Sequence, residues 1–326
     1  MTDDNTSILA ERPMPYAPAG SGARIWHPFI VLIGGFFTFM FWAVLPQGIL
    51  GGIDGASGMT DLLDPRSLTT RYALPALAAG FGLILLHFVF WTRTIERRPL
   101  ASIGLQAPAF AARYIRGLGI GIIFAIIGTV GGAAIATSMG YTVPELAPST
   151  LPRLSETLML TALLIVPAFL LQAGTEEVVF RGWMLSALSA RTSITLAVIV
   201  SGAAFGLFHL DRLLVDPTFA AVFMAGTSVM GVFLGVWAVQ ARSIAGPMGF
   251  HGAYNALLML SSYLEAAANA APADTGSAVF FRMMQEGMSS APRYMDYIAV
   301  QQTLIVALSI IGIVGIMLSR PSSEND

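Results

Sequence analysis

Residues 157–190 read TLMLTALLIVPAFLLQAGTEEVVFRGWMLSALSA, a run of 34 residues whose only charged side chains are Glu176, Glu177 and Arg181. An α-helix rises 1.5 Å per residue, and about 20 apolar residues cross the roughly 30 Å hydrocarbon core of a bilayer. As one helix, this run would be about 50 Å long, which is more than a membrane requires. The stretch therefore predicts a membrane-spanning helix that carries three charges within it.

The rest of the chain has the composition of a membrane protein. Of its 326 residues, 55% are hydrophobic and only 11% are charged, and the mean hydropathy is +0.72. Soluble globular proteins carry roughly 25% charged residues, so this chain has too few to cover a water-soluble surface. The composition excludes an ordinary soluble enzyme and a disordered chain, and it predicts an integral membrane protein.

The charged residues and the missing cysteine exclude further classes of protein. The net charge is -2, whereas nucleic-acid binding favours a basic excess, so no nucleic-acid partner is expected. The absence of cysteine excludes disulfides, thiol nucleophiles and cysteine metal sites. All 17 basic residues are arginine, so no lysine is present to form a Schiff base. A chain rich in arginine, alanine and glycine also fits a GC-rich bacterial genome.

Eight apolar segments predict an all-α, polytopic membrane helix bundle. They are Phe29–Leu50, Tyr72–Thr92, Gly117–Met139, Thr157–Ala190, Ile194–Leu210, Phe219–Gln240, Ser243–Leu264 and Ile298–Ser319. The transmembrane domain would comprise residues 28–319, flanked by a mobile tail of residues 1–27 and a short tail of residues 320–326. Residues 265–297 would form a loop, in which residues 279–284 could instead form an amphipathic helix at the membrane interface.

The distribution of arginine predicts the orientation of the bundle. Eight crossings would place both termini on the same side of the membrane. The loop of residues 93–116 carries five arginines and one acid, and with this loop inside, eleven of the 17 arginines face the cytoplasm. Positive residues favour the cytoplasmic side. We therefore expect both termini in the cytoplasm and, for a bacterial chain, a location in the inner (plasma) membrane.

The three charges of the long apolar run are functional candidates, because an ionisable group inside a membrane helix is costly unless it is paired or faces water. Glu177 and Arg181 are four residues apart, so they share a helix face and can form an ion pair. Glu176 is rotated by about 100° from its neighbour and cannot share that partner equally well. This interpretation leaves Glu176 as the carboxylate available for chemistry, although a purely structural network of all three is also possible.

Two histidines in later segments share the same four-residue spacing with a second side chain. Phe205 and His209 lie on one helix face, and His251 and Asn255 lie on another. If the fourth and fifth segments form an antiparallel hairpin with its turn near residue 191, Glu176 and His209 both lie roughly 22–26 Å from that turn. We therefore expect Glu176 and His209 at similar depth in the membrane.

Taken together and in order, these motifs resemble those of a known family. Glu176-Glu177-x-x-x-Arg181, Phe205-x-x-x-His209 and His251-x-x-x-Asn255 occur within about 80 residues. The sequence over residues 154–264 is similar to the CAAX-protease and bacteriocin-processing family of intramembrane endopeptidases, also called the Abi family. The stretch ERRPLASIGL at residues 96–105 also resembles the segment that precedes the core of this family.

The resemblance implies a helix bundle around a polar cavity, in which a peptide bond is hydrolysed. It implies catalytic roles for Glu176, His209, His251 and Asn255, and supporting roles for Glu177, Arg181 and Phe205. Glu176 would activate water with help from His209, and the other two catalytic side chains would bind the oxyanion. Peptide hydrolysis requires a base and such donors. No cofactor would be needed, and the partners would be a peptide or membrane-protein substrate and the lipid bilayer.

Two other interpretations remain open at this point. Glu176, His209 and His251 could hold zinc and leave one position for water, with Glu177 as the base, although the chain has no His-Glu-x-x-His motif. Alternatively, the same cavity could bind peptides without cleaving them, as in an immunity or scaffold protein. The sequence does not specify the substrate, its cleavage site or the oligomeric state.

Overall fold

A computed structural model of the chain describes residues 14–20, 22–53, 73–105, 108–144, 155–271 and 274–319. Within these residues every regular element is helical, which confirms the predicted fold class. The α-helices are α2 (Pro28–Ile53), α4 (Ala73–Phe90), α5 (Phe110–Ile126), α6 (Gly132–Ser138), α7 (Glu156–Glu177), α8 (Leu185–Ser189), α9 (Ile194–Leu207), α10 (Pro217–Ala241), α11 (Ala245–Ala268), α12 (Gly276–Ser290) and α13 (Met295–Leu318). Three segments are π-helical, η1 (Trp91–Ile95), η3 (Ile127–Gly131) and η4 (Val178–Met184), and three are 3-10 helices, η2 (Leu100–Ile103), η5 (Leu210–Leu214) and η6 (Ala291–Tyr294).

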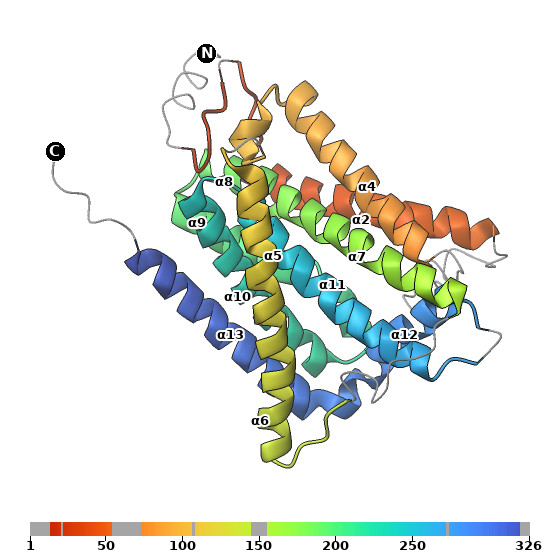
Figure 1. Ribbon diagram of the computed structural model, residues 1–326. Helices are drawn as coiled ribbons and strands as arrows, with labels where there is room; N and C mark the ends of the chain where they lie inside the picture. Colours follow the sequence, from red (N-terminus) through yellow and green to blue (C-terminus); the bar gives the residue numbers. More distant parts are fainter. Residues whose placement is uncertain are drawn as a thin grey trace.

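The helices α7 and α11 lie at the centre of the bundle (Figure 1). α11 packs against both α5 and α7, and α7 also packs against α4, which in turn packs against α2. α10 packs against both α9 and α13. The first described residues and the end of α13 lie toward the same end of the bundle, at the upper left of Figure 1.

Seven helical stretches are long and apolar enough to cross a bilayer, so the chain is an integral membrane protein. They correspond to seven of the eight predicted spans. The remaining predicted span, Ser243–Leu264, is the helix α11, but it is not among the seven, so a total of eight stays a prediction. Large apolar side chains such as Phe37, Leu163 and Ile311 are 65–66% exposed, as expected on a surface that contacts lipid.

The helices that carry the motifs begin at residues that cap them. The side chains of Ser155, Ser193 and Asp216 accept hydrogen bonds from backbone N–H groups in the first turns of α7, α9 and α10. Such caps satisfy donors that have no partner within the helix. The turn between α8 and α9 contains Arg191, as the predicted hairpin requires.

The segment predicted as a loop at residues 265–297 contains a helix of 15 residues, α12. Val279, Phe280 and Met283 lie on one side of it and are buried, and α12 packs against α7 and α11. The amphipathic helix considered for residues 279–284 is therefore present. Its apolar side contacts the bundle, because three apolar side chains at helical spacing form an apolar stripe that is stabilised by burial against other helices.

Helices α5 and α11 cross at unusually short distance, because glycines face the neighbouring backbone. A Cβ atom added to Gly117 would lie 2.1 Å from the carbonyl oxygen of Gly246, and one added to Gly121 would lie 2.2 Å from that of Phe250. A Cβ atom on Gly249 of α11 would meet the Tyr114 carbonyl oxygen at 2.1 Å. Small residues that allow such close approach are typical of membrane helix interfaces. This contact fixes the position of α11, which carries His251 and Asn255.

We expect Gly121→Ala to lower the free energy of unfolding by about 1–3 kcal/mol, because the new methyl group must push α5 and α11 apart. The matched control is Gly119→Ala on the same helix, where an added Cβ atom has no neighbour within 4 Å. This control should be neutral or stabilising by up to about 1 kcal/mol, since alanine favours helix more than glycine does. Thermal unfolding in detergent measures both, and equal midpoints would contradict the proposed close contact.

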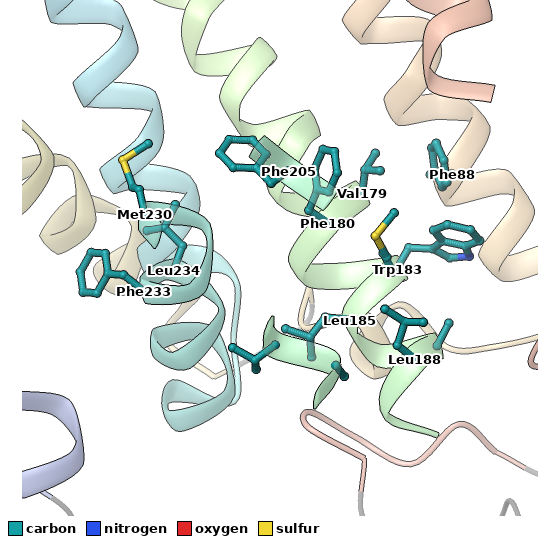
Figure 2. Packing of buried hydrophobic residues seen from close by; sticks show 14 of the residues in the cluster. Phe88, Val179, Phe180, Trp183, Leu185, Leu188, Phe205, Met230, Phe233 and Leu234 are labelled. Carbon is teal, nitrogen blue, oxygen red and sulfur yellow. The ribbon is translucent and has the colours of Figure 1, made fainter. Parts of the chain in front are cut away.

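The largest apolar cluster surrounds η4 and joins it to α8, α9 and α10 (Figure 2). Phe180 and Phe205 pack edge to face with ring centroids 5.2 Å apart, and Trp183 packs against Phe88 of α4 at 4.9 Å. Figure 2 shows Met230 and Phe233 of α10 on the other side of this cluster. Side chains packed on all sides hold the charged part of the long helix in place.

The N-terminal segment differs from the free tail that we expected from its composition. Residues 14–20 and 22–27 lie against the bundle, and Tyr16, Ala19 and Ile25 are buried. Arg242 donates a hydrogen bond to the backbone oxygen of Tyr16, and the Arg24 N–H donates to the Glu96 carbonyl at 2.8 Å. Polar composition did not indicate this packing, because most of its polar contacts use backbone groups. The remaining tail residues, 1–13 and 320–326, lie outside the described residues.

Candidate active site

The long helix carries its charged pair where sequence spacing placed it. Arg181 Nη1 lies 3.0 Å from Glu177 Oε1, and both side chains are completely buried. This confirms the predicted ion pair. The guanidinium also lies 4.2 Å above the ring of Phe205, close enough for a cation–π contact. Pairing and the aromatic contact together offset part of the cost of burying two charges.

His251 connects this pair to Glu176. Its Nδ1 lies 2.9 Å from Glu177 Oε1, and its Nε2 lies 3.1 Å from Asn255 Nδ2 and 3.6 Å from Glu176 Oε2. Because an amide nitrogen only donates, Nε2 acts as the acceptor, and the proton of a neutral imidazole is on Nδ1, facing Glu177. The structure thus assembles Glu176, Glu177, Arg181, His251 and Asn255 from two helical stretches, one in α7–η4 and one in α11.

Gln172 is part of the same cluster, and sequence reasoning missed it. Its Nε2 donates to Glu176 Oε1, and its Oε1 accepts from Asn255 Nδ2 at 2.9 Å. The signal was present, since Gln172 is a polar residue in an apolar run, four residues before Glu176 and on the same helix face. Both N–H groups of Asn255 are therefore engaged, one with Gln172 and one with His251.

His209 lies at the end of α9, next to the other motif residues. Its Nδ1 lies 3.1 Å from the carbonyl oxygen of Phe205, so this nitrogen donates and Nε2 is left as an acceptor. The ring of Phe205 contacts both histidines, with centroid distances of 5.6 Å to His209 and 5.5 Å to His251. Phe205 therefore contacts both imidazoles.

These side chains line one cavity of about 1160 Å³. Gln172, Glu176, His209, His251 and Asn255 contribute to its wall. The predicted catalytic residues thus meet at one space, whereas Glu177 and Arg181 lie behind the wall, where they can orient His251. A cavity of this size can accept several residues of a peptide, and its carboxylate, two imidazoles and two amides can exchange protons and donate hydrogen bonds.

Comparison with known proteins finds a family that this part of the chain resembles. Residues 158–257 match the family model described as type II CAAX prenyl endopeptidase, Rce1-like. We call these residues, which are similar to that family, the Rce1-like segment. The match confirms the resemblance to CAAX proteases read from the motifs, and the matched residues include all three motifs. No curated protein matches the chain.

The zinc alternative requires three side chains in the Rce1-like segment to converge. Among the described residues, which include all three, no group of His, Asp and Glu side chains is close enough to hold a metal ion. Glu176 Oε2 and His251 Nε2 lie 3.6 Å apart, whereas His209 does not form a group with them that is close enough for a metal ion. The residues in this conformation therefore do not fit a three-ligand zinc site, and we derive no step through a metal.

Tyr16 supports the Rce1-like segment from outside the matched residues. In the π-helical segment η4, the N–H of Leu185 bonds to the carbonyls of Phe180 and Gly182 and not to that of Arg181. The buried Tyr16 hydroxyl donates to this Arg181 carbonyl at 2.6 Å. Burial raises the pKa of the Tyr16 phenol above its usual value, so the hydroxyl stays protonated and remains a donor. Tyr16 thus adds a hydrogen bond between the N-terminal segment and the backbone of η4.

We expect Tyr16→Phe to lower the free energy of unfolding by about 0.5–1.5 kcal/mol, because the buried Arg181 carbonyl would lose the hydrogen bond from the Tyr16 hydroxyl. Peptide cleavage should fall as well, since Arg181 positions Glu177 and through it His251. Thermal unfolding and cleavage assays of the purified variant measure the two effects. Tyr141→Phe, at a tyrosine that is only partly buried, is the control and should change neither. Wild-type values for both measurements would argue against this role.

Proposed function

We propose that the protein is an intramembrane endopeptidase that hydrolyses a peptide bond of a membrane-associated protein or peptide, using Glu176 as the base. The observation that carries this proposal is that Glu176, His209, His251 and Asn255 all line the one cavity described above. The Rce1-like match over these residues supports the assignment to peptide hydrolysis.

The first step is proton transfer from water to Glu176. Gln172 holds Oε1 of Glu176, which leaves Oε2 as the oxygen that takes the proton. The resulting hydroxide attacks the carbonyl carbon of the scissile bond, and the C=O electrons move onto oxygen. The Nε2 acceptor of His209 can hold the same water by accepting its second hydrogen. A positioned base of this kind contributes a factor of about 100 to 10,000 in rate.

The oxyanion would then be bound by Asn255. In the substrate-free arrangement one N–H of Asn255 is bonded to the neutral Oε1 of Gln172. A negatively charged oxyanion is a stronger acceptor than an amide oxygen, so this N–H can transfer to it. His251, held by Glu177 through Nδ1, keeps the second N–H of Asn255 in place. When the C–N bond breaks, the proton on Glu176 passes to the leaving nitrogen, which yields a carboxylic acid and an amine.

Cleavage of a quenched-fluorescence peptide library by the purified protein in detergent tests this function. We expect cleavage that a strong chelator leaves unchanged. Loss of cleavage on chelation, restored by zinc, would replace the proposed chemistry with a metallohydrolase. Peptide binding without cleavage would favour a non-catalytic peptide-binding protein.

We also propose that both termini face the cytoplasm, and the lack of cysteine makes this directly testable. Ser319→Cys lies at the end of α13, and Thr142→Cys follows α6 at the opposite end of the bundle (Figure 1). With intact cells, an impermeant maleimide should label Thr142→Cys only, and Ser319→Cys should react after the membrane is opened. The reverse pattern would invert the orientation. Labelling of both in intact cells would show that the two positions share a side.

A further inference from the structure

A second group of polar side chains lines the same cavity and takes no part in the proposed chemistry. It consists of Thr129 in η3, Tyr254 in α11, and Tyr297, Gln301 and Gln302 in α13. All but Tyr254 lie outside the Rce1-like residues 158–257. We call these five residues the neutral wall.

The neutral wall is continuous with the catalytic cluster. Tyr254 follows His251 by one helical turn on α11, and Gln301 Nε2 donates to the hydroxyl of Tyr297 at 3.2 Å. A Cβ atom on Gly132 would lie 3.4 Å from the Cα atom of Gln301, so the helix that begins after η3 lies directly against α13. A Cβ atom on Gly226 would lie 1.9 Å from Gln302 Oε1, so the glycine at this position leaves the room that the Gln302 amide occupies.

The polar atoms of this wall need a partner. The Oγ1 atom of Thr129 is buried and has no hydrogen-bond partner among the described residues. The amide of Gln301 donates to the Tyr297 hydroxyl, although it has a second N–H donor and an acceptor oxygen. Polar groups inside a membrane protein are costly unless they are bonded or face water. Polar groups on one wall of the cavity, with bonding capacity that Gln301 and Tyr297 do not use on each other, therefore favour a polar occupant.

The chemistry of the neutral wall limits the class of molecule that can occupy the cavity. Hydroxyl and amide groups of this kind can each donate and accept, and none of the five is ionisable near neutral pH. The formally charged residues on the lining other than Glu176 lie on η5, the end of α11, α12 and η6, the last of which directly precedes α13. The main chain of an unwound peptide offers alternating N–H and C=O groups without charge, and it needs such partners inside a membrane.

We propose that the neutral wall binds the main chain of an extended, uncharged substrate segment beside the scissile bond. Charged substrate residues stay near the arginines and glutamates that line the cavity on η5, the end of α11, α12 and η6. This inference rests on the proposed function, because a peptide must be unwound before its bond can be cleaved. It adds the class of segment that the site accepts, an apolar stretch without ionised side chains.

The test measures binding and cleavage separately. A short dansyl-labelled peptide of leucine, alanine and glycine residues is titrated into purified Glu176→Gln protein, together with forms that are N-methylated at one amide each. Gln301→Leu and Tyr254→Phe are introduced into the same protein. The control is Thr303→Val, which removes a hydroxyl from the exposed side of α13.

N-methylation at one or two positions should weaken binding about tenfold, as expected for the loss of one buried hydrogen bond. In Gln301→Leu or Tyr254→Phe, N-methylation at one of these positions should no longer weaken binding. In Thr303→Val, N-methylation should weaken binding at the same positions as in the parent protein. Replacing one apolar peptide residue by lysine should also weaken binding about tenfold or more. The same peptide profile in all variants, insensitivity to N-methylation, or no binding would each overturn the proposal and leave the wall as a water-filled lining only.

Failure of this proposal differs from failure of the proposed function. The function is tested by cleavage in the protein that retains Glu176, whereas the wall is tested by binding to protein that lacks this base. Suppose that Glu176→Gln abolishes cleavage but that the wall variants leave the N-methylation profile unchanged. The endopeptidase function would then be retained, and the role proposed for the neutral wall would be rejected. An unchanged cleavage rate in Glu176→Gln would reject the proposed base even if the wall variants alter binding.

Discussion

Replacing Glu176 by glutamine is expected to lower the rate of peptide cleavage by a factor of about 100 to 10,000, because the amide cannot take a proton from water. Glutamine has nearly the same size and can still accept the hydrogen bond from Gln172, so the fold should be retained. Cleavage of the fluorescent peptide by matched amounts of wild-type and variant protein measures the effect, and thermal unfolding checks the fold.

Glu156→Gln is the matched control for this variant. It is the same substitution on the same helix, at an exposed position in the first turn of α7. Its cleavage rate should equal that of the wild type, and its free energy of unfolding should fall by no more than about 1 kcal/mol, because an acid near a helix N-terminus is worth about 0.3–1 kcal/mol. If Glu176→Gln cleaves as fast as Glu156→Gln, Glu176 is not the base.

Periodicity was sufficient for the parts of the fold that depend on the local chain. Apolar run length predicted seven of the membrane helices, because one helix must satisfy all its backbone groups by itself in lipid. The four-residue spacing of Glu177 and Arg181 predicted their contact, since it is set by one helix. The resemblance to CAAX proteases extended this reasoning to His209, His251 and Asn255, which the fold brings to one cavity.

The contacts that sequence reasoning missed are those made between distant segments. Tyr16 donates to the backbone carbonyl of Arg181 across 165 positions, and no local pattern indicates this contact. The bonds of Asn255 to Gln172 and of His251 to Glu177 depend on how α11 is placed against α7, which the glycines of α5 determine. Periodicity carries no information about such register between helices. It also could not show that α11, with its glycines and polar residues, lies at the centre of the bundle.

Arg181→Met should lower the free energy of unfolding by about 3–5 kcal/mol, because it leaves the completely buried Glu177 carboxylate without its counter-charge. Thermal unfolding in detergent measures this change. The control is Arg282→Met, which breaks an ion pair with Asp274 in which the arginine side chain is 44% exposed. Exposed pairs contribute little, so the unfolding midpoint of this control should stay close to that of the wild type.

The double variant Glu177→Gln/Arg181→Met separates the charge from the packing. It removes both buried charges, while the glutamine oxygen can still accept the hydrogen bond from His251 Nδ1. If the loss in Arg181→Met comes from the unpaired carboxylate, the double variant should regain most of the lost stability. If it comes from the lost contact of the guanidinium with Phe205, the double variant should be as unstable as Arg181→Met alone. In the first case, the cleavage rate of the double variant shows whether the negative charge of Glu177 is needed in addition to its hydrogen bond to His251. That hydrogen bond holds His251, and through it Asn255, in place for the oxyanion.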